Sequence, residues 1–290
     1  DLGWLHNGGL IERVFVRAGG YTGVLGTVSS EGTLFASMAT FGVVNHKTCS
    51  SRDSLLKSKL IILWGWNPAA SRSYGDILWY LGKIREAGIR VVAVDPRYSE
   101  TAAMLAEKWI PVRPGTDAAM MAGMAYVMLS EGLEDRAFLD RYTLGFDRFE
   151  AYILGREDGV PRTPQWASRI TGASAEDITG LAREYAVTKP AALMNGYAIA
   201  RTAYGEQADR MAAALAAMTG NIGVPGGSSG MGVNVGQQRV SGPGFICSRM
   251  KGGDNPLDAT APMRKGSVFY QRKEETVKGF SSASKWYGGG

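Results

Sequence analysis

An α/β fold, with parallel strands alternating with helices, is predicted by three features of the sequence. Three short apolar runs, at Lys59–Trp64, Arg90–Val94 and Trp109–Val112, have the length and residue types of buried strands. Each run is followed by a turn rich in glycine, proline or polar residues, and then by a helical pattern. Strands that alternate with helices in this way form a parallel sheet covered on both faces.

The first strand, Lys59–Trp64, ends in Gly65-Trp66-Asn67-Pro68. Glycine adopts backbone angles that other residues avoid, and the residue before a proline is held extended, so a sharp turn is expected here. A helix follows and ends at Gly88. Its apolar residues at helical spacing are Ile77, Leu78, Leu81 and Ile84.

The next two strands end in similar turns. Asp95-Pro96-Arg97 follows Arg90–Val94, and Arg113-Pro114-Gly115-Thr116-Asp117 follows Trp109–Val112 at the start of another helix. In parallel sheets, ligands bind beyond the carboxyl ends of the strands. Backbone amides and arginine suit phosphate, while a carboxylate suits a ribose diol or the amino edge of guanine. The candidate ligands are Trp64, Gly65, Asn67, Asp95, Arg97, Gly115 and Asp117. The pattern predicts a nucleotide-type site.

Simpler interpretations of the same loops remain open. No G-x-G-x-x-G sequence follows the first strand, so the standard dinucleotide fingerprint is absent. Gly65–Pro68 is also consistent with a plain turn, and Asp95 and Asp117 with helix caps. Three such loops in register favour a ligand site over three unrelated turns.

The second half of the chain continues the alternation. Residues 118–131 form a methionine- and alanine-rich helix, in which methionine is expected to fill the core. Pro164 and Ser174 mark the starts of two further helices. A strand at 191–194 ends at Gly196, and Arg201 follows in a loop. This repeats the pattern of a strand end with ligand-like residues.

Together these loops resemble the molybdopterin oxidoreductases of the dimethyl sulfoxide reductase family. The resemblance is carried by Trp64-Gly-Trp-Asn-Pro68, Val94-Asp-Pro-Arg97 and Arg113-Pro-Gly-Thr-Asp117. It extends through Gly19-Gly-Tyr…Ser29, Pro164-Gln-Trp-Ala167, Gly196…Arg201 and Thr219-Gly-Asn-Ile-Gly-Val-Pro-Gly-Gly227. It covers roughly residues 8–230 and is strongest to the catalytic subunits of membrane-associated reductases.

The resemblance implies a molybdenum bis(molybdopterin guanine dinucleotide) cofactor and reduction of an S-oxide or N-oxide by oxygen-atom transfer. The strand-end residues named above would hold one guanine dinucleotide, with Gly196 and Arg201 on its other side. It also implies an iron–sulfur electron-transfer subunit, a membrane anchor linked to quinol, and a periplasmic or extracytoplasmic location. An iron–sulfur cluster is expected only in a missing N-terminal segment or in the partner subunit.

Ser29 falls where the family's metal-ligating side chain lies, so the resemblance implies that Ser29 is the catalytic molybdenum ligand. Its deprotonated oxygen would be a hard ligand for an oxidised metal. Ser30 takes this role if the alignment shifts by one residue. From the residues alone, the plain interpretation of this serine pair is an N-cap of the helix that follows.

Cysteine and histidine are too sparse for other metal sites. Cys49 and Cys247 cannot supply four iron–sulfur ligands, and His6 and His46 argue against zinc. Cys49 is interpreted as a small structural side chain, with a thiolate ligand as the alternative, and His46 as a loop residue. The net charge of +5 comes from dispersed basic residues without a nucleic-acid motif, so no nucleic-acid partner is expected.

The organisation predicted from these motifs has four parts. Residues 1–58 are part of a second α/β domain with the metal ligand, and 59–160 are a Rossmann-like domain for the guanine dinucleotide. Residues 161–227 return to the second domain, and 228–290 form an irregular extension. No signal peptide or transmembrane run is seen in the chain.

Members of the family are much longer, so the chain is expected to be a fragment or the product of a shortened gene. Two other functions remain open: a non-catalytic remnant that binds nucleotide or pterin, and an unrelated nucleotide-dependent α/β enzyme.

Overall fold

The computed structural model describes residues 14, 17–19, 29–43, 45, 48–72 and 76–231. The predictions for His6, His46 and Cys247 lie outside these residues, as do the glycine motif over 20–28 and the extension beyond residue 231.

One parallel sheet lies at the centre of the described part of the chain, with the strand order β3-β2-β1-β4. The strands are β1 (Leu60–Trp64), β2 (Arg90–Val94), β3 (Lys108–Ile110) and β4 (Ala191–Asn195). The last residue of β1, Trp64, is in register with Val94 of β2 and Asn195 of β4. This confirms the predicted α/β class.

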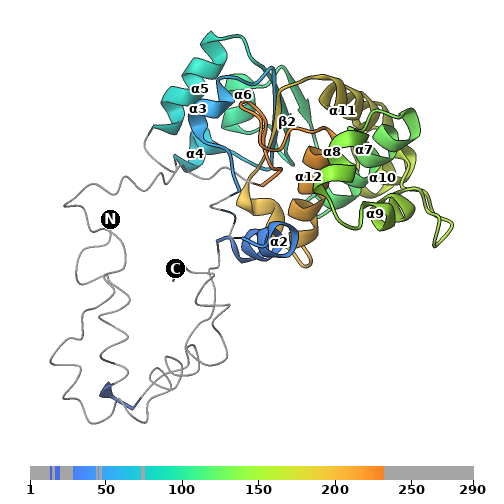
Figure 1. Ribbon diagram of the computed structural model, residues 1–290. Helices are drawn as coiled ribbons and strands as arrows, with labels where there is room; N and C mark the ends of the chain where they lie inside the picture. The colour runs from blue at the N-terminus through green and yellow to red at the C-terminus, as the bar shows by residue number, and fades with distance from the viewer. Residues whose placement is uncertain are drawn as a thin grey trace. The chain divides into compact units, whose positions relative to one another are not determined.

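Helices that precede β1 and that follow β1 and β2 cover the first face of the sheet (Figure 1). They are α3 (Arg52–Leu55), α4 (Pro68–Ser71), α5 (Ile77–Glu86) and α6 (Glu100–Leu105). Ile61 and Leu63 of β1 point to this face, because successive strand residues alternate between faces. They pack against Ile77, Leu81 and Ile84, which lie at the predicted helical spacing of α5.

The second face carries a larger set of helices. They are α7 (Asp117–Glu131), α8 (Arg136–Tyr142), α9 (Phe146–Ile153), α10 (Pro164–Thr171), α11 (Ala175–Val187) and α12 (Glu206–Met218). Leu60, Ile62 and Trp64 of β1 point to this face. The methionines of α7 join them in the core, as the sequence predicts: Met120, Met121, Met124 and Met128.

The observed sheet differs from the predicted organisation at residue 160. β4, from the 161–227 part, pairs directly with β1, from the 59–160 part, so both parts form a single sheet. Helix α2 (Glu31–Phe41), from the first predicted part, packs against α12. Two contacts therefore join distant parts of the sequence: the pairing of β4 with β1, and the packing of α2 on α12. No helix among the described residues is long and apolar enough to span a membrane.

Candidate functional site

The carboxyl ends of the four strands lie along one edge of the sheet, because all the pairings are parallel. Backbone hydrogen bonds continue the ladder past the last strand residues: Gly65 donates to Val94 at 2.8 Å, and Gly196 donates to Trp64 at 2.8 Å. The predicted meeting of the strand ends at a common edge is thus observed. The loops with the candidate residues all leave the sheet from here.

Two glycines make close backbone contact at this edge. A Cβ atom added to Gly196 would lie 2.0 Å from the carbonyl oxygen of Gly65 and 2.9 Å from the Cα of Trp66. Gly65 itself has a φ of 56°, in the left-handed region that favours glycine. The backbones of the loops after β1 and β4 therefore pack directly on each other at this edge.

Trp64 and Asp117 face each other in the interior behind this edge. The Trp64 indole is fully buried and donates a hydrogen bond of 2.8 Å to the carboxylate of Asp117. Asp117 is the first residue of α7 and is 5% exposed. Burial raises the pKa of Asp117 and outweighs the indole hydrogen bond, which lowers it. These two predicted ligands therefore brace β1 against α7, and the Trp64 side chain presents no surface to a ligand.

Asn67 is also engaged within the protein. Its side-chain oxygen accepts hydrogen bonds from the Thr101 hydroxyl at 2.7 Å and the Thr101 amide at 3.2 Å. Its side-chain nitrogen donates to Glu100 at 2.7 Å. The Asn67 amide thus attaches the loop after β1 to the start of α6. This role shapes the loop whether or not Asn67 also meets a ligand.

Asp95 and Arg97 are the accessible charged pair at the end of β2. The Asp95 carboxylate accepts a 3.0 Å hydrogen bond from the backbone amide of Arg97, which fixes the turn. Partial burial raises the pKa of Asp95, and the neighbouring Arg97 only partly opposes this shift. The Arg97 guanidinium is exposed and lies 3.2 Å from Glu100. A carboxylate and a guanidinium are therefore presented together at the edge.

The loop after β3 lies beside the loop after β4. Gly115 is exposed with a φ of 77°, and a Cβ atom there would lie 3.7 Å from the Thr202 side chain. Thr202 follows the short helical turn η3 (Tyr197–Ala200). The predicted site residues Gly115 and Arg201 are thus carried by adjacent loops.

Arg201 also brings Ser29 to this group of loops. Its Nε atom donates a hydrogen bond of 2.9 Å to the backbone carbonyl of Ser29, although 172 residues separate them. The N-cap of α2 is Ser30, so Ser29 precedes the helix and is exposed. The N-cap position is therefore that of Ser30, whose side chain makes no capping hydrogen bond to the helix. Ser29 and the predicted cofactor residues after β4 are neighbours in the fold.

Cys49 is half-buried between Thr48 and Ser50. The Ser50 hydroxyl donates a hydrogen bond of 2.8 Å to the carbonyl of Gly227. Within the described ranges, no three His, Cys, Asp or Glu side chains gather into a metal site.

A buried polar cluster at the end of β4 was not predicted. The side-chain nitrogen of Asn195 donates a hydrogen bond of 3.0 Å to the carboxylate of Asp209 on α12 and one of 2.8 Å to the carbonyl of Gly230. The Thr33 hydroxyl of α2 also faces Asp209. Burial raises the pKa of Asp209 to about 6, and the charge of Asp117 adds to this effect. Leaving such buried groups without partners costs on the order of 1–3 kcal/mol each.

The sequence does contain a signal for this cluster. Asp209 lies three, four and seven residues before Ala212, Ala213 and Ala216, which are all buried. An acid on the apolar stripe of a helix is a candidate buried group.

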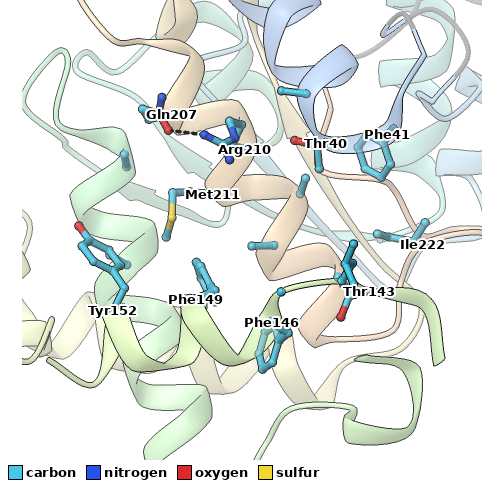
Figure 2. Close-up of a pocket in the computed structure, with 18 of the residues that line it drawn as sticks. Thr40, Phe41, Thr143, Phe146, Phe149, Tyr152, Gln207, Arg210, Met211 and Ile222 are labelled. Carbon is cyan, nitrogen blue, oxygen red and sulfur yellow. Dashed lines mark hydrogen bonds between the residues drawn. The ribbon is translucent and has the colours of Figure 1, made fainter. Parts of the chain in front are cut away.

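A groove with a volume of about 1490 Å³ opens among α2, α7, α9 and α12 (Figure 2). Phe149 and Tyr152 of α9 face Met211 of α12 across it. Gln207 and Arg210 form its polar margin and are joined by a hydrogen bond of 3.1 Å. Gly115 and Thr116 also line it, so the groove borders the loop after β3.

Two curated proteins with known names are similar in sequence to this chain. Dimethyl sulfoxide reductase DmsA of Escherichia coli is 41% identical over 242 residues, which cover 78% of this chain and 30% of that protein. Trimethylamine-N-oxide reductase of Haemophilus influenzae is 36% identical over 233 residues, covering 77% of this chain and 28% of that protein. The chain thus spans about 30% of the length of these relatives.

A solved structure supports the fold. Acetylene hydratase from Pelobacter acetylenicus matches 66% of this chain and 24% of its own, with a TM-score of 0.52 and 23% identity. At this identity the likeness concerns the fold alone. The family model for molybdopterin oxidoreductases matches residues 6–281, nearly the whole sequence. The chain belongs to the molybdopterin oxidoreductase family.

Proposed function

We propose that this chain is part of the catalytic subunit of a molybdenum-dependent reductase. Its substrate would be an S-oxide or N-oxide, reduced by oxygen-atom transfer at a molybdenum bis(molybdopterin guanine dinucleotide) centre. The family assignment and the names of two relatives, a dimethyl sulfoxide reductase and a trimethylamine-N-oxide reductase, support this class. The observation that carries it furthest is the shared edge, where Ser29, Arg201 and the strand-end loops are neighbours.

The residues at this edge fit a guanine dinucleotide. Gly65 and Gly196 let the loops after β1 and β4 pack directly on each other at the edge where a pyrophosphate would approach. The half-exposed Asp95 carboxylate suits ribose hydroxyls or the amino edge of guanine, and the exposed Arg97 suits phosphate. In this proposal Gly115 and Arg201 complete the contacts. Trp64, Asn67 and Asp117 support the loops from behind.

Ser29 is proposed as the protein ligand of molybdenum. It is exposed, lies just before α2, and its backbone is held by Arg201. When bound, the cofactor supplies the two-electron oxygen-atom chemistry. The chain supplies position: it fixes the ligand beside the loops that hold the nucleotide. Electrons would reach the site from an iron–sulfur subunit with a membrane anchor, on the extracytoplasmic side of the membrane.

Replacing Ser29 tests the proposal. In the full-length protein, Ser29→Ala should lower reduction of dimethyl sulfoxide or trimethylamine N-oxide by about 100-fold or more, because even residues behind a metal ligand contribute 10–100-fold. Pterin content, measured by fluorescence after denaturation, should stay at the wild-type level. Ser30→Ala is the matched comparison, one residue along the chain.

The outcomes separate the alternatives. A larger loss in Ser30→Ala than in Ser29→Ala would move the ligand by one residue. Wild-type protein that carries pterin or guanine nucleotide without molybdenum would indicate a non-catalytic remnant. Wild-type protein that releases no pterin and carries no molybdenum would overturn the proposed cofactor.

A further inference from the structure

Three buried side chains meet where α2, β4 and α12 come together. Thr33, Asn195 and Asp209 are 1%, 2% and 0% exposed. Each has one buried oxygen that makes no hydrogen bond to the residues that the structure describes. These atoms are Thr33 Oγ1, Asn195 Oδ1 and Asp209 Oδ2. Buried polar groups usually find partners, so such a cluster in one place indicates a role beyond packing.

The cluster repeats the arrangement of Trp64 and Asp117 on the neighbouring strand. Trp64 and Asn195 are paired in register as the last residues of β1 and β4. Each donates a hydrogen bond to an acid in the first turn of a helix on the same face, Asp117 of α7 and Asp209 of α12. Both acids therefore tie a helix to the functional edge of the sheet.

Asp209 differs from Asp117 in also facing α2. Thr33 lies in the first turn of α2, four residues after Ser29, and its hydroxyl lies beside the Asp209 carboxylate. Gly32 packs so closely on Ala200 that an added Cβ atom would lie 2.6 Å from its carbonyl oxygen. The first turn of α2 thus lies against Asp209 in the interior, and Arg201 donates a hydrogen bond to the carbonyl of Ser29 at the surface.

We propose that Asp209 is a positioning residue for the metal ligand: through Thr33 it seats the first turn of α2 against the end of β4 and thereby fixes Ser29. This inference rests on the proposed function, in which Ser29 binds molybdenum. Asp209 is fully buried and acts through α2 rather than on the substrate.

The test uses the full-length, molybdenum-loaded enzyme. Asp209→Ala should lower kcat by about 10- to 100-fold per molybdenum, because small misplacement of a reacting group has effects of this size. KM should change little, and the electron paramagnetic resonance spectrum of the molybdenum(V) state should shift. Asp209→Asn keeps the shape and a partner for Asn195, so it should restore most of the activity and the wild-type spectrum.

Two further variants keep the test decisive. Thr33→Val removes only the hydroxyl, so it should reproduce the spectral shift in smaller form even if Asp209→Ala folds poorly. Glu206→Gln, on the same helix turn and half-exposed, is the control and should leave the spectrum unchanged. A wild-type spectrum and kcat in both Asp209→Ala and Thr33→Val would overturn the positioning role alone. A wild-type enzyme without molybdenum would overturn the proposed function, and this inference with it.

Discussion

Replacing Gly196 with alanine should lower the free energy of unfolding by about 3 kcal/mol or more, at the upper end of the cost of overpacking. The new Cβ atom would lie 2.0 Å from the carbonyl oxygen of Gly65 and 2.7 Å from its carbon. Both are backbone atoms at the end of an adjacent strand, so no side chain can turn away. Relief requires β4 to move from β1, which breaks the hydrogen bond from Gly196 to Trp64.

Chemical denaturation of the chain, followed by circular dichroism, measures this loss. Gly180→Ala is the matched control, because Gly180 lies in α11, is exposed and has open space around its Cα atom. There alanine should stabilise the chain by about 0.5–1 kcal/mol, since glycine is a poor helix former. Equal midpoints for Gly196→Ala and the wild type would show that the two strand ends do not approach this closely.

The same contact shows how far the sequence alone could lead. Gly65 and Gly196 were both expected at strand ends, because each follows an apolar run. Their contact was not predictable, since β1 and β4 are separated by more than 120 residues and their pairing depends on the order of strands in the sheet. Local patterns predict elements, and the tertiary pairing decides which loops meet.

Contacts within the folded protein decided the roles of individual side chains in the same way. Trp64 and Asn67 were predicted as ligands, yet both are engaged within the protein. A fully apolar strand such as β1 gives no sign of which face each residue takes, because polar and apolar residues do not alternate along it. Asp209 escaped prediction for the opposite reason: it lies in a helix with other charged residues, and only its apolar neighbours three and four positions on marked it as buried.

Trp64→Phe should cost about 2–3 kcal/mol of folding free energy at neutral pH. Most of this comes from Asp117, whose buried carboxylate would lose its 2.8 Å indole donor. The remainder comes from the smaller ring at a fully buried position. Trp79→Phe is the matched control: Trp79 is 57% exposed on α5, and its replacement should change stability by less than about 0.5 kcal/mol.

The pH dependence separates the two contributions. The folded pKa of Asp117 is raised above its unfolded value, so its contribution to stability is full below the unfolded pKa and is lost as pH rises through the folded pKa. The indole hydrogen bond opposes this shift, so Trp64→Phe raises the folded pKa further and enlarges the loss at higher pH. The difference between variant and wild type should therefore be small near pH 4 and increase toward pH 8. A difference that stays constant over this range would mean that ring volume alone accounts for the loss, and that the indole does not stabilise a charged Asp117.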